Sequence, residues 1–177
     1  MPITEQQLLQ ILPSAGRNAG VFVPALNVAM GKYGIVTRLR TAAFVAQVGH
    51  ESGQFRWVRE IWGPSAQQAG YEGRADLGNT MKGDGSKFRG RGLIQITGRT
   101  NYAACGEALC LDLINRPELL ELPQNAAMSA AWFWSTRGLN TLADTGDFMK
   151  ITRRINGGIN GLEDRLALWE RAKKVLA

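Results

Sequence analysis

The chain has 177 residues, of which 45% are apolar and 20% charged, a composition that fits one globular domain over residues 1–177. No apolar run approaches the roughly 18 residues that a membrane span needs, and the N-terminal segment MPITEQQLLQ lacks the features of a secretion signal. We therefore expect synthesis in the cytoplasm and no stable membrane insertion. The net charge of +6 suits a polyanionic partner, but the arginines are dispersed and no nucleic-acid-binding motif accompanies them, so nucleic acid is not predicted.

Three helices are predicted in the first part of the chain, over residues 4–12, 23–32 and 37–52. The first begins with the capping-box pair Thr4 and Gln7, followed by a leucine- and isoleucine-rich stretch. A segment containing proline and glycine then separates it from the second. The third has a threonine N-cap at its start and a glycine stop signal after its end.

Residues 63–85 are rich in glycine, proline, asparagine and aspartate and are predicted to form an irregular loop. The following GRGLIQITG segment, residues 90–98, has three aliphatic side chains between glycines and predicts a short strand or hairpin edge. Four more helices are predicted, at about 102–109, 124–135, 147–155 and 162–176. These elements predict an α+β fold that is predominantly α, with a small β element beside a cleft and no separate second domain.

Two glutamates stand nine positions apart, Glu51 at the end of the third predicted helix and Glu60 after it. Glu51 shares a mostly apolar helical stripe with Phe44, and poor solvation there would favour the protonated form that a general acid requires. The same position also fits a helix-terminal glutamate in a surface ion pair with Arg56 or Arg38. The connecting sequence SGQFRWVR is long enough to turn the chain and place Glu60 across a groove.

Metal and thiol chemistry find little support in the sequence. His50 and two cysteines are too few soft donors for a zinc site with three or four protein ligands, and HESGQ lacks the second histidine of HExxH. We therefore predict neither a metal nor a cofactor. Cys105 and Cys110 are interpreted as structural thiols, because helical geometry at that spacing would need distortion to pair them. A cysteine peptidase using one of them with His50 is an alternative.

Four segments together resemble glycoside hydrolase family 19, the plant-type chitinases, and within it the endolysins of phages and prophages of Gram-negative hosts. They are HESGQF at 50–55, VREIWGPS at 58–65, FRGRGLIQITGRTNY at 88–102 and INGGINGLEDR at 155–165. The resemblance covers most of the chain and implies a lysozyme-like fold. It also implies inverting hydrolysis of a sugar polymer, in which two carboxyl groups roughly 6.5 to 9.5 Å apart flank the scissile bond.

The resemblance implies a role for individual residues. Glu51 would be the general acid, Glu60 the general base, and Thr97 the hydroxyl that helps the base to hold water. Substrate-binding positions are implied at Gln95, Asn101, Tyr102, Asn156 and Arg165. Glu72 is an alternative second carboxylate at a spacing nearer to that of plant chitinases, but the REIWGPS context of Glu60 is similar to the endolysin pattern.

Aromatic and basic side chains are predicted to surround these positions. Candidate platforms for sugar rings are Trp57, Trp62, Tyr71 and Tyr102, whereas Trp132, Phe133, Trp134 and Trp169 are predicted to be core residues. Arg89 and Arg91 are expected to support the wall of the groove or to pair with Glu60. His50 is interpreted as structural, because helical geometry points it away from Glu51.

Together these features predict an endolysin, a lysozyme that cuts the glycan backbone of peptidoglycan and lyses the host. A chitinase acting on N-acetylglucosamine polymers and a non-catalytic wall-binding module are the alternatives. Because no secretion signal is visible, the resemblance implies that a holin gives the protein access to the periplasm, where it would act. We expect a monomer.

Overall fold

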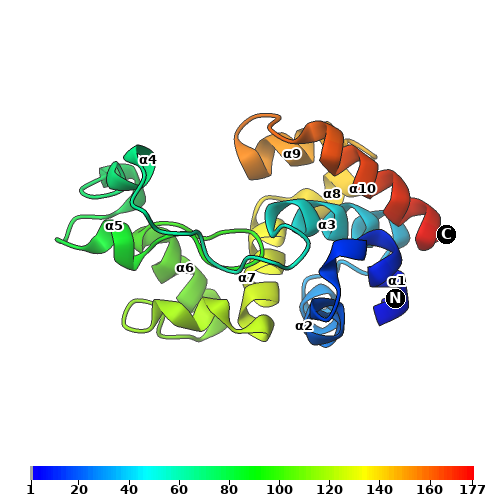
Figure 1. Ribbon diagram of the computed structural model, residues 1–177, viewed down its shortest axis with the longest axis horizontal. Coiled ribbons are helices and arrows are strands. Elements are labelled where there is room, and N and C mark those ends of the chain that lie inside the picture. Colours follow the sequence, from blue (N-terminus) through cyan, green and yellow to red (C-terminus); the bar gives the residue numbers. More distant parts are fainter. Residues whose placement is uncertain (1) are drawn as a thin grey trace.

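The computed structural model describes residues 2–177, and within them almost all regular structure is helical (Figure 1). The α-helices of the larger lobe are α1 (Glu5–Ile11), α2 (Asn18–Lys32), α3 (Arg38–Glu51), α7 (Pro123–Thr136), α8 (Leu139–Asp144), α9 (Phe148–Asn156) and α10 (Leu162–Val175). Those of the smaller lobe are α4 (Ala66–Ala69), α5 (Asp84–Lys87) and α6 (Arg99–Leu109). Three short 3-10 helices lie at Pro13–Ala15, Ala75–Leu77 and Pro117–Glu121.

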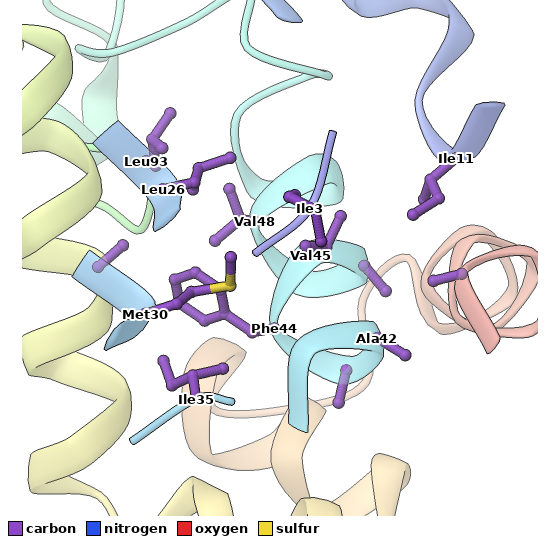
Figure 2. Packing of buried hydrophobic residues seen from close by; sticks show 14 of the residues in the cluster. Ile3, Ile11, Leu26, Met30, Ile35, Ala42, Phe44, Val45, Val48 and Leu93 are labelled. Atoms are coloured by element: carbon purple, nitrogen blue, oxygen red, sulfur yellow. The ribbon is translucent and has the colours of Figure 1, made fainter. Parts of the chain in front are cut away.

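Helix α3 lies at the centre of the larger lobe, and its residues 41–49 are all buried. In Figure 2, Phe44 and Val48 point from α3 towards Met30 and Leu26 of α2. Phe44 also meets the Trp134 ring edge-on, with centroids 5.3 Å apart. Helix α10 packs against another side of α3, while α2 packs against α7. The helix that ends at Glu51 is therefore fixed from several directions.

Several predicted helices are confirmed because their end signals are local. The Thr4 hydroxyl accepts from the Gln7 backbone N–H at 3.1 Å, and the Gln7 side chain accepts from the Thr4 N–H at 2.9 Å, which completes the capping box of α1. The Thr37 hydroxyl caps α3 by accepting from Arg40 N–H. Helices α7, α9 and α10 begin and end within one residue of their predicted limits.

Other predictions were wrong where tertiary packing decided the outcome. Helix α2 begins at Asn18 and continues through Pro24, because Ala19 and Phe22 are buried on the same face. The proline there lacks the N–H that a helix interior uses. Helix α6 begins at Arg99, three residues earlier than predicted, and helix α8 was not predicted. The predicted loop at 63–85 contains the one-turn helix α4 and the first two residues of α5.

The predicted β element is reduced to two isolated antiparallel bridges, Arg59 with Arg91 and Arg91 with Ile96. The segment 91–96 curls back on itself, since Arg91 and Ile96 exchange backbone hydrogen bonds of 3.1 and 2.8 Å. Its side chains join two cores: Leu93 and Ile94 belong to the main core, whereas Ile96 belongs to the smaller core around Phe88. Figure 2 places Leu93 beside Leu26 in the main core. This segment therefore anchors the smaller lobe to the larger one.

In the described part of the chain, residues 2–177, no helix combines the length and apolar character required to cross a membrane.

Candidate active site

Glu51 is the last residue of α3. Helix α3 belongs to the larger lobe, and α4 to α6 lie on the other side of the molecule (Figure 1). Glu51 Oε1 lies 2.6 Å from Nη2 of Arg165, whose side chain is 1% exposed, while the Glu51 side chain is 22% exposed. Oε1 itself is shielded from solvent and has no aligned hydrogen bond. The contact between Glu51 and Arg165 is therefore an ion pair without a hydrogen bond of good geometry. The surface pairing of Glu51 with Arg56 or Arg38 that the sequence left open does not form: Arg38 donates to the Lys173 carbonyl, and Arg56 lies over the Trp57 ring.

A buried polar network fixes Arg165 beside Glu51. Arg165 Nη1 donates to Gln47 Oε1 at 2.6 Å, and its Nε donates to the Asn160 carbonyl at 3.0 Å. Gln47 Nε2 in turn donates to the Thr152 hydroxyl of α9 at 2.9 Å. Gln47 precedes Glu51 by one helical turn, so α3 presents both side chains to the same guanidinium. No role was predicted for Gln47 or Thr152, although a glutamine within an apolar helical stripe is a signal of such a network.

Glu60 is held mainly by neutral donors. It follows Val58 in an extended segment that runs beside residues 90–92: Glu60 N–H donates to the Gly90 carbonyl at 2.9 Å, and Gly92 N–H donates to the Val58 carbonyl at 2.8 Å. The Glu60 carboxylate accepts from Gly90 N–H at 2.6 Å through Oε1 and from Gln68 Nε2 at 3.2 Å through Oε2. An ionised carboxylate can accept on both oxygens, as Glu60 does.

Tyr71 adds a further contact to Glu60. Burial of its phenol, followed by the negative charge of Glu60 and a hydrogen bond to it, raises the pKa of Tyr71. The tyrosine therefore stays a neutral donor beside the carboxylate at physiological pH. Trp62 packs against Tyr71 with ring centroids 6.1 Å apart, and the Arg89 guanidinium lies over Trp62 at 4.9 Å. These side chains tie the region of Glu60 to α4 and α5.

The two arginines expected near Glu60 have other partners. Arg91 Nε donates to Glu121 at 3.0 Å, and its Nη1 donates to the Lys87 carbonyl at 2.7 Å. Arg89 Nε donates to the Ser86 carbonyl at 2.9 Å. Both therefore support the wall of residues 88–92, which was one of the two expected roles, and neither forms an ion pair with Glu60.

Three predicted residues line one small pocket. Gln95, Thr97 and Asn101 surround it together with Ile96, Trp132, Phe133 and Arg137. Asn101 Nδ2 donates to the Thr97 carbonyl at 2.8 Å, which fixes the start of α6 against this turn. Gln95 also lies against Gly90, the residue that binds Glu60: a Cβ at position 90 would stand 2.5 Å from Gln95 Oε1. Gln95 therefore connects the pocket to Gly90, whose N–H binds the Glu60 carboxylate.

Trp132 and Phe133 were expected in the core, but both are partly exposed and line this pocket. Trp134 is fully buried, and Trp169 is partly buried, with its ring stacked on Phe148 at 4.6 Å. The AAMSAAWFW run of α7 hid this division, because three consecutive aromatic residues on a helix point in different directions.

Tyr102 is fully buried in the smaller core. Its hydroxyl donates to the Arg89 carbonyl and accepts from Arg91 Nη1 at 3.0 Å. Burial raises its pKa strongly, so the phenol remains protonated. A contribution of Tyr102 to sugar binding would therefore act through the Arg89 backbone that its hydroxyl anchors, because the ring has no exposed surface.

Asn156 is the last residue of α9, and the loop that follows it leads to α10 and Arg165. Asn156 is exposed, and its Oδ1 accepts from Asn160 N–H at 3.3 Å. His50 Nδ1 lies 2.7 Å from Asp164 Oδ2, and its ring rests on Gly161, where a Cβ would collide with it. Gly161 also has φ of +71°, which favours glycine. His50 thus secures this loop to α3, while Asn156 remains accessible.

The alternative carboxylate and thiols lie elsewhere. Glu72 Oε1 accepts from Gly83 N–H at 3.0 Å, within the loops of the smaller lobe. Cys105 and Cys110 are both free; burial raises the pKa of Cys105 to about 12, and Cys110 is exposed. Within residues 2–177, no group of three or more His, Cys, Asp or Glu side chains is arranged to hold a metal ion.

Comparisons with known proteins identify relatives of the chain. Residues 19–144 match the family 19 glycoside hydrolases, described as chitinase class I. A Haemophilus influenzae protein described as glycosyl hydrolase family 19 domain-containing is 35% identical over 199 residues, covering 96% of this chain and 94% of that protein. An Arabidopsis thaliana endochitinase is 37% identical over 128 residues, covering 71% of this chain and 41% of its own length. The chain thus spans less than half of that plant relative.

Solved structures extend the comparison to the fold. A bacterial family 19 chitinase superposes with a TM-score of 0.79 and 26% identity, covering 100% of this chain and 96% of the other. Chitinase C from Streptomyces griseus HUT6037 has a TM-score of 0.77 and 25% identity, with 98% and 76% covered. The mostly helical architecture is therefore the lysozyme-like fold of these enzymes. On the family match and these relatives, the chain belongs to glycoside hydrolase family 19 and is a glycosidase that hydrolyses glycans.

Proposed function

We propose that this glycosidase is an endolysin, a lysozyme that hydrolyses the glycan backbone of peptidoglycan and so lyses a bacterial host. The observation that carries the chemistry is the pair of carboxyl groups with unlike partners. Glu51 stands beside the buried guanidinium of Arg165, whereas Glu60 accepts hydrogen bonds from Gly90 and Gln68. A separate acid and base require two carboxyl groups in different surroundings. A guanidinium by itself favours an ionised carboxylate, so the acid is assigned to Glu51 from the resemblance of HESGQF to the family segment.

The proposed reaction is a single inverting displacement. Protonated Glu51 gives its proton to the glycosidic oxygen as the bond from that oxygen to the anomeric carbon breaks. Glu60 removes a proton from a water molecule, whose oxygen forms the new bond to the anomeric carbon from the opposite face. When Glu51 takes up a proton, Arg165 keeps two neutral acceptors, Gln47 Oε1 and the Asn160 carbonyl. We assign Thr97 to holding the water with Glu60.

Sugar binding is assigned to the pocket beside α6 and to the C-terminal end of α9. Gln95 and Asn101 line the pocket, and Asn156 is exposed at the C-terminal end of α9. Arg165 and Tyr102 are buried and would act by holding Glu51 and the Arg89 backbone in place. Amide side chains suit the acetamido and hydroxyl groups of amino sugars because they both donate and accept hydrogen bonds.

Charge supports the bacterial wall as the substrate. Peptidoglycan carries carboxylates on its peptides, chitin is neutral, and the chain has a net charge of +6. The Haemophilus influenzae relative also matches this chain over nearly the whole length of both proteins. The second candidate is a chitinase, which is favoured by the names of the plant relatives and of the similar solved structures.

A direct test compares two substrates. We expect the protein to reduce the turbidity of Gram-negative cells stripped of their outer membrane and to release little sugar from colloidal chitin. Activity on chitin alone would replace the endolysin by a chitinase. Glu51→Gln protein is the control: if it lyses the stripped cells as fast as the parent, a non-catalytic binding or membrane-disrupting function replaces hydrolysis. Mass analysis of the soluble fragments identifies the reducing-end sugar and hence the bond that is cut.

We also propose that the protein acts in the periplasm as a monomer and reaches the wall through a holin. Induced expression alone should then leave cells intact, whereas permeabilising the inner membrane should cause rapid lysis. Lysis on induction without permeabilisation would contradict the need for a holin.

A further inference from the structure

We propose that a basic hollow on α9 binds the carboxylates of the peptide branches on a peptidoglycan strand; this inference rests on the proposed function and deepens it. The hollow has a volume of about 440 Å³ and is lined by Asp147, Met149, Lys150, Arg153 and Arg154. None of these lining residues is assigned to the reaction or to sugar binding in the proposed function.

The cations of this region lack acidic partners. Within residues 2–177, Lys150, Arg153, Arg154 and the neighbouring Arg137 take part in none of the ion pairs, although many other arginines do. The carboxylate nearest to them in the hollow, Asp147, accepts from the Lys150 backbone N–H at 3.1 Å and caps α9. The positive charge is therefore available to an anion from outside.

The orientation of α9 explains why these side chains gather. Its buried face consists of Phe148, Ile151 and Thr152, and Phe148 stacks on Trp169 of α10. Lys150 and Arg154 follow one another at helical spacing, as do Met149 and Arg153, so both pairs lie on the solvent side. Thr152 belongs to the network that holds Arg165, so the basic face and the Glu51 network share one helix.

Arg137 connects the basic hollow to the candidate sugar pocket. Arg154 Nη1 donates to the Arg137 carbonyl at 2.8 Å. The Arg137 side chain lines the pocket formed with Gln95, Thr97 and Asn101, where its guanidinium lies 3.9 Å from the centroid of the Phe133 ring. When one sugar of a glycan occupies that pocket, we expect a substituent on the neighbouring sugar to extend past Arg137 towards the cations of α9.

The chemistry of the occupant follows from this placement. Peptide branches of peptidoglycan bear several carboxylates, and arginine binds carboxylates through a planar fork of donors. Chitin has no such branch, so contacts in the basic hollow would favour the wall polymer without altering the reacting groups. An anionic membrane surface is the competing partner, and the experiment separates the two.

The test measures binding to soluble glycan strands that keep their peptides and to the same strands stripped by an amidase. All proteins carry Glu51→Gln to prevent turnover. We expect peptide-bearing strands to bind about tenfold more tightly, and Lys150→Glu with Arg153→Glu to abolish that preference, since both substitutions replace a cation of the basic hollow by a carboxylate that repels the peptide. The control, Arg17→Glu with Lys174→Glu, makes the same change in charge at two exposed sites, the residue that precedes α2 and the last turn of α10.

Each outcome decides the proposal. Equal binding of both strands by the parent overturns it, as does a control variant that loses the preference equally. Loss of binding to anionic lipid vesicles with an unchanged preference for peptide-bearing strands also overturns it and assigns the basic hollow to membranes. Peptide-dependent binding would support the basic hollow even if the protein that retains Glu51 fails to cleave the strands. That failure would refute hydrolysis of the wall. If Glu51→Gln impairs folding, the same charge variants are made in protein that retains Glu51. The ratio of kcat/KM on strands with peptides to kcat/KM on strands without them then gives the same comparison.

Discussion

The two candidate catalytic carboxyl groups are positioned by different kinds of structure. Glu51 ends a buried helix and lies beside Arg165, which is held by the side chains and loop of the larger lobe. Glu60 lies on an extended segment, where a backbone N–H and the Gln68 amide hold its carboxylate. One position depends on a charged partner in the core, and the other depends on the approach of two segments outside regular secondary structure.

Because of this difference, a substitution of Glu51 should lower both the reaction rate and the stability. A substitution of Glu60 should lower the rate and leave the stability nearly unchanged. A buried guanidinium that loses its carboxylate keeps its charge and loses its compensation. A backbone N–H that loses a carboxylate can still donate to an amide oxygen. Substitutions that remove charge without changing shape therefore separate the two cases.

The largest effect is expected for Glu51→Gln. Removing the proton donor should lower kcat by about 10²- to 10⁴-fold, the usual contribution of general acid catalysis. The melting temperature should fall as well, because Arg165 is 1% exposed and this substitution removes its ion-pair partner. Hydrolysis rates and thermal melts of the same preparation check both expectations. A variant with normal kcat would remove Glu51 from the reaction.

A comparable loss of rate, with a much smaller loss of stability, is expected for Glu60→Gln. Water activation should fall by about 10²-fold or more. The amide oxygen of the new side chain can still accept from Gly90 N–H, so the free energy of unfolding should change by less than about 1 kcal/mol. Urea denaturation measures the second quantity. Should Glu72→Gln abolish activity and Glu60→Gln spare it, the base would be Glu72.

Arg165→Met tests the charged network directly. The substitution leaves the Glu51 carboxylate and the Gln47 side chain without their guanidinium, and the expected loss is about 2 to 4 kcal/mol, reduced from the fully buried case because Glu51 is 22% exposed. Arg165→Met combined with Glu51→Gln removes both charges and should recover part of that loss. A double variant less stable than Arg165→Met would show that charge compensation is not what holds this helix end.

The smaller lobe contains its own ion pair, which predicts a pH dependence. Asp84 is 2% exposed in its side chain, and a two-pronged hydrogen bond from Arg99 lowers its pKa below 3.8. Because the folded-state pKa is depressed, the stabilisation is complete above the unfolded-state value and is lost as the pH falls towards the folded-state pKa.

Asp84→Asn should therefore lower stability by about 2 kcal/mol at neutral pH and flatten the loss of stability below pH 3.8. Melting temperatures from pH 2 to pH 7 measure the difference. Parallel profiles for the two proteins would exclude Asp84 as a source of acid sensitivity.

Local signals in the sequence predicted much of the fold and part of the site. The threonine caps of α1 and α3 depend on residues three positions apart, and the four-segment resemblance identified the family. The ion pair of Glu51 could not be predicted from the residues alone, because Arg165 is 114 positions away and nearer arginines were available. Helix α8 was missed for a similar reason: its buried residues, Leu139 and Ala143, find their partners only in the tertiary structure.

The smallest expected effect concerns Gly90, on which the placement of Glu60 depends. A Cβ at this position would stand 2.5 Å from Gln95 Oε1, the end of a flexible side chain, so Gly90→Ala should displace Gln95 at a cost of about 1 kcal/mol. The displacement should also shift Gly90 N–H relative to Glu60 and lower kcat severalfold. Gly31→Ala is a matched control, since a Cβ there meets nothing within 4 Å and a helical alanine should stabilise α2.

Combining Gly90→Ala with Gln95→Ala separates steric strain from the loss of a sugar contact. Truncating Gln95 removes the two atoms that the new methyl group meets most closely, Oε1 and Cδ, and leaves the Gln95 Cβ at 3.1 Å. The double variant should therefore regain most of the unfolding free energy that Gly90→Ala loses. Its kcat/KM should nevertheless stay below that of the parent if Gln95 binds the glycan. If the double variant is as unstable as Gly90→Ala, the glycine is required by the backbone itself. Stability would then be as sensitive to the neutral packing around Glu60 as to the charged network around Glu51.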